Sequence, residues 1–230
     1  MRRLSRILGS LLVVAGALTL VWVVVVWRWQ DPFTALYTHF QQARLAHAYD
    51  RRAAEFHPKA TPGDLAAVEH AVAQEAAAYR KTLHRGDPVG RIKIGRIGVN
   101  MVVVQGTDHE TLKKGPGHYI ESGLPGGGHL IYVAGHRTTY LAPFAYINNI
   151  RVGDYIRFEV PYGTFIYRVT KHYVVADDAV RVLQDHGTEI LRLQACHPRF
   201  FATHRYIVDA KLVHVAPRGG TPYTATTAAT

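Results

Sequence analysis

The single cysteine of this 230-residue chain lies where a predicted strand meets a loop. In the segment 189–200, EILRLQACHPRF, alternate residues share a face, so Arg192, Gln194 and Cys196 point to the same side. Pro198 cannot continue a central strand, which places Cys196 at the strand end. A thiol that faces a loop can act as a nucleophile, although a free cysteine is commonly a small buried apolar residue.

Two further side chains suit the chemistry of such a nucleophile. Arg205 begins the next predicted strand, and a hairpin through residues 197–204 would bring it beside Cys196. Its guanidinium can donate hydrogen bonds to a carbonyl or a developing oxyanion, although surface arginines are common in a basic chain. His136 follows Gly135 at the end of another predicted strand and can transfer protons near neutral pH. Because the chain has 14 histidines, the position of His136 alone identifies no role.

The segment 88–217 must position these groups, and its pattern predicts an all-β fold. It contains seven or eight runs rich in Val, Ile, Tyr and Phe, as strands are. Residues 155–160 and 164–170 flank a Pro-Tyr-Gly turn and predict a hairpin. So many strands in so short a segment indicate a closed or nearly closed barrel. The low-complexity tail, residues 218–230, is expected to be disordered.

The first thirty residues predict a membrane anchor. Residues 7–27 carry no charge, and a helix of that length spans roughly 30 Å, the thickness of the hydrocarbon core of a bilayer. Three arginines precede this span and one follows it, so the N-terminus is expected in the cytoplasm and the rest of the chain outside it. The alternative is a cleaved signal peptide, but no small-residue cleavage site follows Trp27.

Residues 31–87 predict helices between this anchor and the strands. Apolar residues recur at helical spacing from Phe33 to Phe56, and an alanine-rich helical segment follows and ends before Gly86. We interpret this part of the chain as a helical hairpin or spacer, a stalk between the anchor and the strands, and not as the active domain.

Composition limits the alternatives. The formal net charge is +10, and it falls to +6 without the four arginines of residues 1–30, which suits an anionic neighbourhood such as lipid headgroups or wall polymers. No basic helix or aromatic-basic ribbon predicts binding to nucleic acid. One cysteine excludes an internal disulfide, and no His or Cys spacing predicts a metal site, so we expect no cofactor. The acidic pair Asp177-Asp178 is interpreted as solvated and not as a calcium site.

These segments resemble the sortase family. The cysteine hairpin LQACHPRFFATHRYIVDA is similar to the Leu-x-Thr-Cys…Arg signature of sortases, and AGHRTTYLAPF is similar to their histidine segment. Histidine, cysteine and arginine occur in the family's order within residues 88–217. The residues of the two segments are most similar to those of class E sortases of actinobacteria. Ala195 stands where the common motif has Thr, which affects fine positioning more than activity. The resemblance implies an eight-stranded sortase-type β-barrel.

The resemblance also implies roles for the three residues. Cys196 would attack the Thr–Gly carbonyl of an LPxTG-like or LAxTG-like sorting signal at the C-terminus of a surface protein. His136 would protonate the leaving amine and later deprotonate the incoming one, and Arg205 would hold the carbonyl and the oxyanion. The incoming amine would belong to a peptidoglycan precursor of the cell wall or to a pilin lysine.

The same resemblance implies a substrate groove beside the cysteine strand. The loop 177–187 would form one wall, with Val180, Val182 and Leu183 as its apolar members. Alternatively these three side chains tether the loop to the barrel, in which case the groove lies near residues 140–144, where Tyr140 is the expected contact.

Two other functions stay open at this point. An extracytoplasmic cysteine peptidase would use the same nucleophile with water as the acceptor. A non-catalytic membrane-anchored binding barrel would need no thiol.

Overall fold

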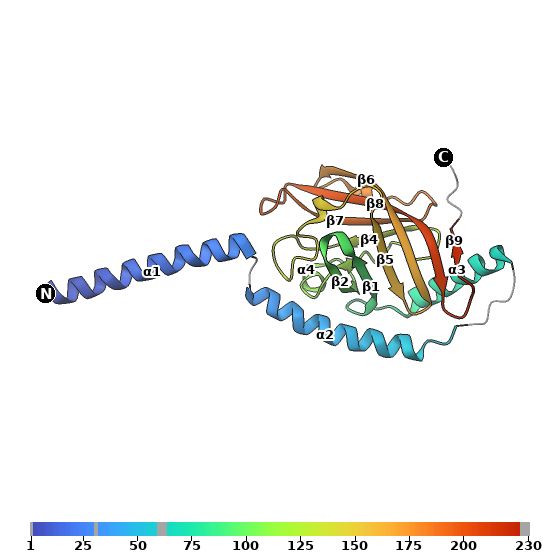
Figure 1. Cartoon of the computed structure of the whole chain (residues 1–230), viewed down its shortest axis with the longest axis horizontal. Helices are drawn as coiled ribbons and strands as arrows, with labels where there is room; N and C mark the ends of the chain where they lie inside the picture. Colours follow the sequence, from blue (N-terminus) through green and yellow to red (C-terminus); the bar gives the residue numbers. More distant parts are fainter. Residues whose placement is uncertain (1, 30–31, 59–63, 226–230) are drawn as a thin grey trace.

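The structure is a computed structural model that describes residues 2–29, 32–58 and 64–225 (Figure 1). Three long helices come first: α1 (Arg2–Trp29), α2 (Pro32–Glu55) and α3 (Leu65–Thr82). The strands are β1 (Pro88–Ile94), β2 (Val99–Gln105), β3 (Gly117–His118), β4 (Leu130–Ala134), β5 (Tyr155–Val160), β6 (Gly163–Ala176), β7 (Ile190–His197), β8 (His204–Pro217) and β9 (Tyr223–Thr224). Short helical turns lie between them: η1 (Gly95–Ile97), α4 (His109–Leu112), η2 (Ile147–Asn149) and η3 (Val180–Leu183).

Strands β1 to β8 form a closed barrel, which confirms the predicted fold. Their order is β6-β5-β1-β2-β3-β4-β7-β8, and pairing of β6 with β8 closes the ring. Two pairs are parallel, β2 with β3 and β4 with β7, and the others are antiparallel. Alternate side chains point inward, so Ile156, Phe158 and Val160 of β5 are buried in one central core.

The described part of the C-terminal tail, residues 218–225, is more ordered than we predicted, and residues 226–230 lie outside the described residues. Strand β7 begins its pairing with β8 at Lys211, so the residues of β8 beyond this position have no β7 partner on that side. Strand β9 takes that place, because Tyr223 pairs with Val215 and Thr224 pairs with His214. The half-buried Tyr223 ring also packs against the core. The prediction of disorder from residue 218 is therefore wrong for this short strand.

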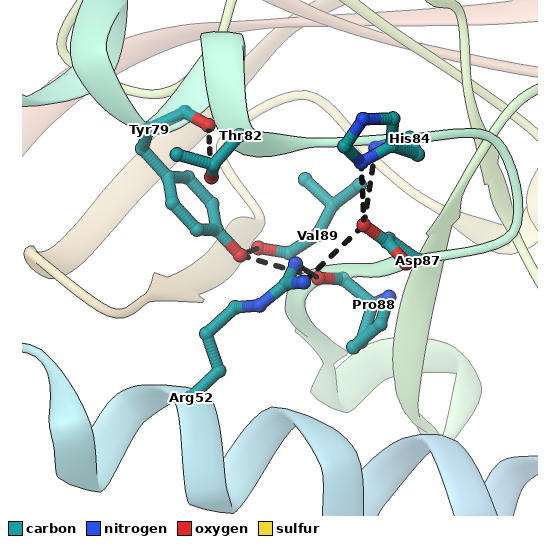
Figure 2. Close-up of polar contacts among 7 residues, drawn as sticks. All are labelled: Arg52, Tyr79, Thr82, His84, Asp87, Pro88 and Val89. Carbon is teal, nitrogen blue, oxygen red and sulfur yellow. Dashed lines mark hydrogen bonds and ion pairs between the residues drawn. The ribbon is translucent and has the colours of Figure 1, made fainter.

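Helices α2 and α3 meet at the start of β1 (Figure 2). Arg52 of α2 pairs with the carboxylate of Asp87 at 3.2 Å and donates to the Pro88 carbonyl at 3.4 Å. The buried Tyr79 hydroxyl of α3 donates to the Val89 carbonyl at 3.0 Å. Both helices therefore hold the first strand of the barrel.

A side chain in the middle of α2 also binds backbone groups of the barrel. The side-chain amide of Gln42 donates to the carbonyls of Val102 (3.0 Å) and Lys114 (2.8 Å), and its oxygen accepts from the Val102 N–H at 2.7 Å. Leu45 and Tyr49 are buried one and two turns further on. Because β2 pairs with β3 over only two residues, Gln42 satisfies backbone groups that the sheet leaves open. Residues 32–58 and 64–87 thus pack against the barrel, and this differs from the separate stalk that we expected.

Helix α1 has the features of a membrane span. Residues 2–25 are long and apolar enough to cross a bilayer, and their side chains are not buried against the rest of the molecule. Figure 1 shows this helix extending away from the barrel. A signal sequence near an N-terminus passes the same test of length and composition.

A buried histidine lies between β3 and the following loop. His118 is fully buried, with Nε2 2.7 Å from the Gly123 carbonyl and Nδ1 2.7 Å from the side-chain oxygen of Gln105. The Ser122 hydroxyl is 3.0 Å from Nε2. Burial lowers the pKa of His118 to about 4, so this side chain stays neutral where an ordinary histidine takes up a proton.

We predict that His118 makes the fold sensitive to mild acid. Above pH ~6.5 the histidine is neutral in both states, and as the pH falls toward about 4 only the unfolded chain binds the proton. Stability should therefore fall by about 2 kcal/mol between pH 7 and pH 5 through this group. Urea unfolding at both pH values should show that His118→Gln removes most of this loss, whereas the exposed control His186→Gln does not. Equal pH dependence in all three proteins would contradict the prediction.

Candidate active site

Three strand ends at one rim of the barrel bring the predicted site residues together. Strand β7 lies between β4 and β8. The Gly135 N–H donates to the Gln194 carbonyl at 3.0 Å, and continuing the parallel register of β4 and β7 by two residues places His136 beside Cys196. On the other side, Cys196 pairs directly with Arg205 in the antiparallel β7–β8 hairpin. The predicted hairpin is thus observed, with an imidazole and a guanidinium on opposite flanks of the thiol.

Cys196 lies on the outer face of β7. Leu193 and Ala195 point into the barrel core, while the free thiol residue is partly exposed. The Ala195 side chain is 1% exposed and faces away from the thiol side of the strand. A threonine here would place its hydroxyl toward the core, so the departure from the common motif removes no group from the side of the strand that carries the thiol.

His136 is held by its own loop. Phe144 packs so closely on Gly135 that a Cβ there would lie 2.6 Å from its ring, which explains the glycine before the histidine. The Phe144 N–H donates to the His136 carbonyl at 3.1 Å. Burial, together with the nearby His109, lowers the pKa of His136, so the neutral imidazole predominates near pH 7. Its Nε2 is buried and has no hydrogen-bond partner among the described residues, so this nitrogen has an unused hydrogen-bonding capacity.

The predicted contact residue Tyr140 lies between His136 and helix α2. Its ring centroid is 5.2 Å from that of His136, and its N–H donates to the Thr34 hydroxyl at 3.0 Å. Tyr140, Leu141 and Ala142 have left-handed backbones, with φ of 55°, 59° and 37°. Such conformations cost on the order of 1 kcal/mol each in residues other than glycine, so the loop depends on surrounding contacts for its shape.

The Arg205 side chain turns back onto the loop between β7 and β8. Its Nη1 donates to the carbonyls of Ala202 (2.7 Å) and His204 (2.9 Å). These bonds fix the half-buried guanidinium beside the strand end through Nη1 alone among the described residues. His204 is exposed and His197 is half-buried, and the two residues pair as the last rung of the β7–β8 ladder before the loop 198–203.

Sequence reasoning missed a second arginine, Arg137. It is buried, and its Nη1 lies 3.1 Å from both the Cys196 carbonyl and Nδ1 of His197. The same guanidinium donates to the Ala145 carbonyl at 3.4 Å and to the side chain of Asn148. Arg137 therefore ties the end of β7 to the loop that carries His136. Its only sequence signal is its place directly after the histidine, and this does not reveal burial.

A buried ion pair holds the loop that was predicted to line the substrate groove. Arg192 donates to both carboxylate oxygens of Asp209, at 2.6 and 2.8 Å, and to the Val182 carbonyl at 2.6 Å. Arg192 shares the outer face of β7 with Cys196, and η3 covers it there. The pair thus fixes η3 against the barrel, below the strand end.

The three apolar residues of η3 differ in exposure. Val182 is buried in a cluster on β4, β6 and β8, and Leu183 packs against that cluster. Val180 is 75% exposed. The structure thus favours the alternative in which Val182 and Leu183 tether the loop to the barrel. Of the three apolar residues, Val180 is the one that is exposed enough for a ligand to reach. Among the described residues, no group of three or more His, Cys, Asp or Glu side chains could hold a metal ion.

The site thus consists of a thiol, an imidazole and a guanidinium on adjacent strand ends of a closed β-barrel. The model of the sortase domain matches residues 92–213. The chain belongs to the sortase family, as its motifs indicated.

Similar proteins include both D-type and E-type sortases. Over 132 residues the chain is 34% identical to Sortase D of Bacillus subtilis (strain 168), which covers 56% of this chain and 65% of that protein. The Sortase D5 transpeptidase of Clostridium perfringens superposes with a TM-score of 0.62 at 22% identity, over 75% of this chain and 98% of that one. Sortase E from Streptomyces avermitilis gives 0.52 at 32% identity, over 58% and 93%. The chain thus spans just under two thirds of the first relative, and the second comparison concerns the fold alone.

We predict that Arg137→Lys disturbs both stability and the cysteine. A lysine cannot reproduce the planar fork, so buried acceptors lose their donors and the free energy of unfolding should fall by about 2–3 kcal/mol. The rate of Cys196 alkylation by iodoacetamide in the folded protein should also change, because the strand end loses its fixed position. Arg151→Lys, at an exposed arginine, is the control. If both variants match the wild type in urea unfolding and alkylation, Arg137 does not hold this site together.

Proposed function

We propose that this protein is a membrane-anchored cysteine transpeptidase. It cleaves an LPxTG-like or LAxTG-like sorting signal between Thr and Gly and joins the acyl group to an amine. The observation that carries this proposal is the buried, unpartnered Nε2 of His136 on one flank of Cys196, with Arg205 paired to Cys196 on the other. Acyl transfer requires a nucleophile, a group that carries the proton, and a hydrogen-bond donor that stabilises the oxyanion.

In the first half of the reaction, Cys196 attacks the Thr carbonyl carbon. The thiol proton passes to His136, a C–S bond forms, and Nε and Nη2 of Arg205 stabilise the oxyanion. The Thr–Gly C–N bond then breaks, and His136 gives its proton to the leaving amine. The lowered pKa of His136 suits this exchange, because a neutral imidazole can accept the thiol proton and returns it readily.

In the second half, an amine attacks the thioester carbonyl. A C–N bond forms, the C–S bond breaks, and a proton of the amine returns through His136 to Cys196. A thioester is reactive enough to acylate an amine without another energy source. The acceptor amine belongs to a wall precursor or to a pilin lysine, and the donors are surface proteins that carry a sorting signal.

Helix α1 is the proposed single-pass anchor, with the N-terminus in the cytoplasm and the barrel outside. Its apolar length and the arginines before it support this topology. A basic, barrel-bearing ectodomain then works close to anionic lipids and wall polymers.

We predict that the three site residues are required for peptide cleavage and not for folding. Cys196→Ala should abolish cleavage of LPxTG and LAxTG peptides by the full-length chain in detergent micelles. His136→Ala and Arg205→Lys should each lower kcat/KM by about 10²–10³-fold, since one oxyanion donor or proton carrier is lost. Melting temperatures should change little.

Two outcomes would contradict these assignments. Turnover by Cys196→Ala would exclude the thiol as the nucleophile, and near-full activity of Arg205→Lys would reduce Arg205 to a local positive charge. Cleavage that yields only hydrolysis at every amine concentration would favour a cysteine peptidase.

We predict that Val180 and Val182 respond differently to substitution. Val180→Ser changes an exposed side chain, so it should raise the KM for the peptide while stability stays the same. Val182→Ser places a hydroxyl in a buried cluster and should lower stability by about 1–3 kcal/mol. Peptide kinetics and thermal unfolding of both variants separate the two effects, and an unchanged KM in Val180→Ser would remove η3 from the substrate site.

A further inference from the structure

The first two turns of α2 carry large apolar side chains that are exposed. Phe33, Leu36 and Phe40 follow one another at steps of three and four residues, so they share one face of the helix. These residues are 72%, 57% and 59% exposed, and we call them the apolar stripe. The opposite face of the same helix carries Leu45 and Tyr49, which are buried against the barrel. Packing on the barrel therefore does not explain the apolar stripe.

The apolar stripe begins beside the end of the proposed membrane span. Residues 2–25 of α1 are long and apolar enough to cross a bilayer. Trp22 lies within this segment, and its ring centroid is 5.6 Å from that of Phe33. The first turn of α2 thus reaches back to the last turn of the span, and Figure 1 shows α2 beginning where α1 ends. Aromatic residues at this level occupy the zone where a span leaves the hydrocarbon core.

Beyond Phe40 the same exposed face of α2 becomes polar. The next exposed positions at the same spacing are Arg44, His47 and Arg51. The apolar part is therefore confined to the two turns nearest α1, and an exposed arginine follows it directly. A helix that lies in a membrane surface has this arrangement. Its apolar side chains enter the boundary between headgroups and acyl chains by roughly 5–10 Å, and its basic side chains stay among the headgroups.

We propose that the apolar stripe is a membrane-docking surface, which inserts into the headgroup boundary of the bilayer that α1 spans. The inference rests on the anchoring role of α1 in the proposed function and adds a second contact with the same lipid surface. A bilayer is favoured over a protein partner because the apolar stripe is continuous with the span, so lipid is already present beside it.

Insertion of the apolar stripe also orients the barrel. Within the same turns, the Thr34 hydroxyl accepts a hydrogen bond from the Tyr140 N–H at 3.0 Å, which joins α2 to the loop of His136. The loop 198–203, at the same rim of the barrel, adds two exposed phenylalanines. A single helix would leave the barrel free to turn about the end of its anchor, whereas a second contact with the lipid restricts that rotation. The docked orientation places the rim that carries Cys196 toward the membrane surface.

Fluorescence quenching tests the docking on the full-length chain in vesicles of phosphatidylcholine and phosphatidylglycerol. Cys196→Ala removes the only cysteine, so a fluorescent label can then be attached through one introduced cysteine at a time. Lipids with a nitroxide near the top of the acyl chain should quench labels introduced by Leu36→Cys and Phe40→Cys. The matched control Ala54→Cys labels an exposed position of α2 roughly 21 Å beyond Phe40. Its label should be quenched about fivefold less.

A label introduced by Leu18→Cys, within α1, reports the anchor separately. Quenching at Leu18 without quenching at Leu36 and Phe40 would overturn the docking surface and leave the anchor intact. Quenching at none of these positions would overturn both. A blue shift of the label at Phe40 without quenching would mean that a protein partner or a second copy covers the apolar stripe, and equal quenching at Ala54 would contradict docking by the first two turns alone.

The orientation of the rim is tested by cleavage. The double variant Leu36→Asp/Phe40→Asp should cleave a sorting peptide that a lipid tail holds on the vesicle about three- to tenfold more slowly than the wild type, because carboxylates resist insertion. It should cleave the soluble peptide in detergent micelles at the wild-type rate, and Ala54→Asp should change neither rate. Equal rates on the vesicle-bound peptide would overturn the docked orientation. If the wild type cleaves neither peptide while the quenching pattern holds, the proposed transpeptidase function fails and the docking surface stands.

Discussion

The parallel pairing of β4 with β7 decides where the chemistry of this molecule can occur. Because the two strands run in the same direction, both end at the same rim of the barrel, and β8 must begin there. His136, Cys196 and Arg205 then lie on adjacent strand ends although they are far apart in the sequence. With β4 reversed, the imidazole would lie at the opposite end of the barrel. Closure by β6 and β8 holds these directions rigid.

Two buried arginines fix the positions of the loops that lie against this rigid barrel. Arg192 uses its fork for Asp209 and the η3 backbone, and Arg137 uses its fork for the ends of β7 and the His136 loop. A buried charge is costly unless every donor finds a partner, so each guanidinium tolerates few arrangements of the backbone around it. The two arginines thus hold η3 and the His136 loop against the barrel by the same physical means.

Local patterns in the sequence were sufficient to predict the arrangement of Cys196 and Arg205 at the centre of the site. Alternation from Leu191 to Cys196, the stop at Pro198 and the hairpin to Arg205 depend on neighbours within about fifteen residues, and the structure has all three. The contact of Thr34 with Tyr140 spans 106 residues, and no period or turn signal records it. The burial of Arg137 and Val182 likewise depends on packing between distant segments. The ordered strand β9 escaped prediction because it fills an edge that only the barrel register creates.

The junction of α1 and α2 has a consequence for the choice of substrates. Only two residues separate Trp29 from Pro32, so the helices begin and end within roughly 11 Å of each other, and the first turns of α2 contact the His136 loop. In the proposed topology, with α1 in a bilayer, so short a connection limits the distance between the lipid surface and the rim that carries Cys196. A proposed substrate that is itself held by a membrane segment would have to present its scissile bond within that distance. The length of the connection would then contribute to substrate choice alongside the residues of the proposed sorting signal.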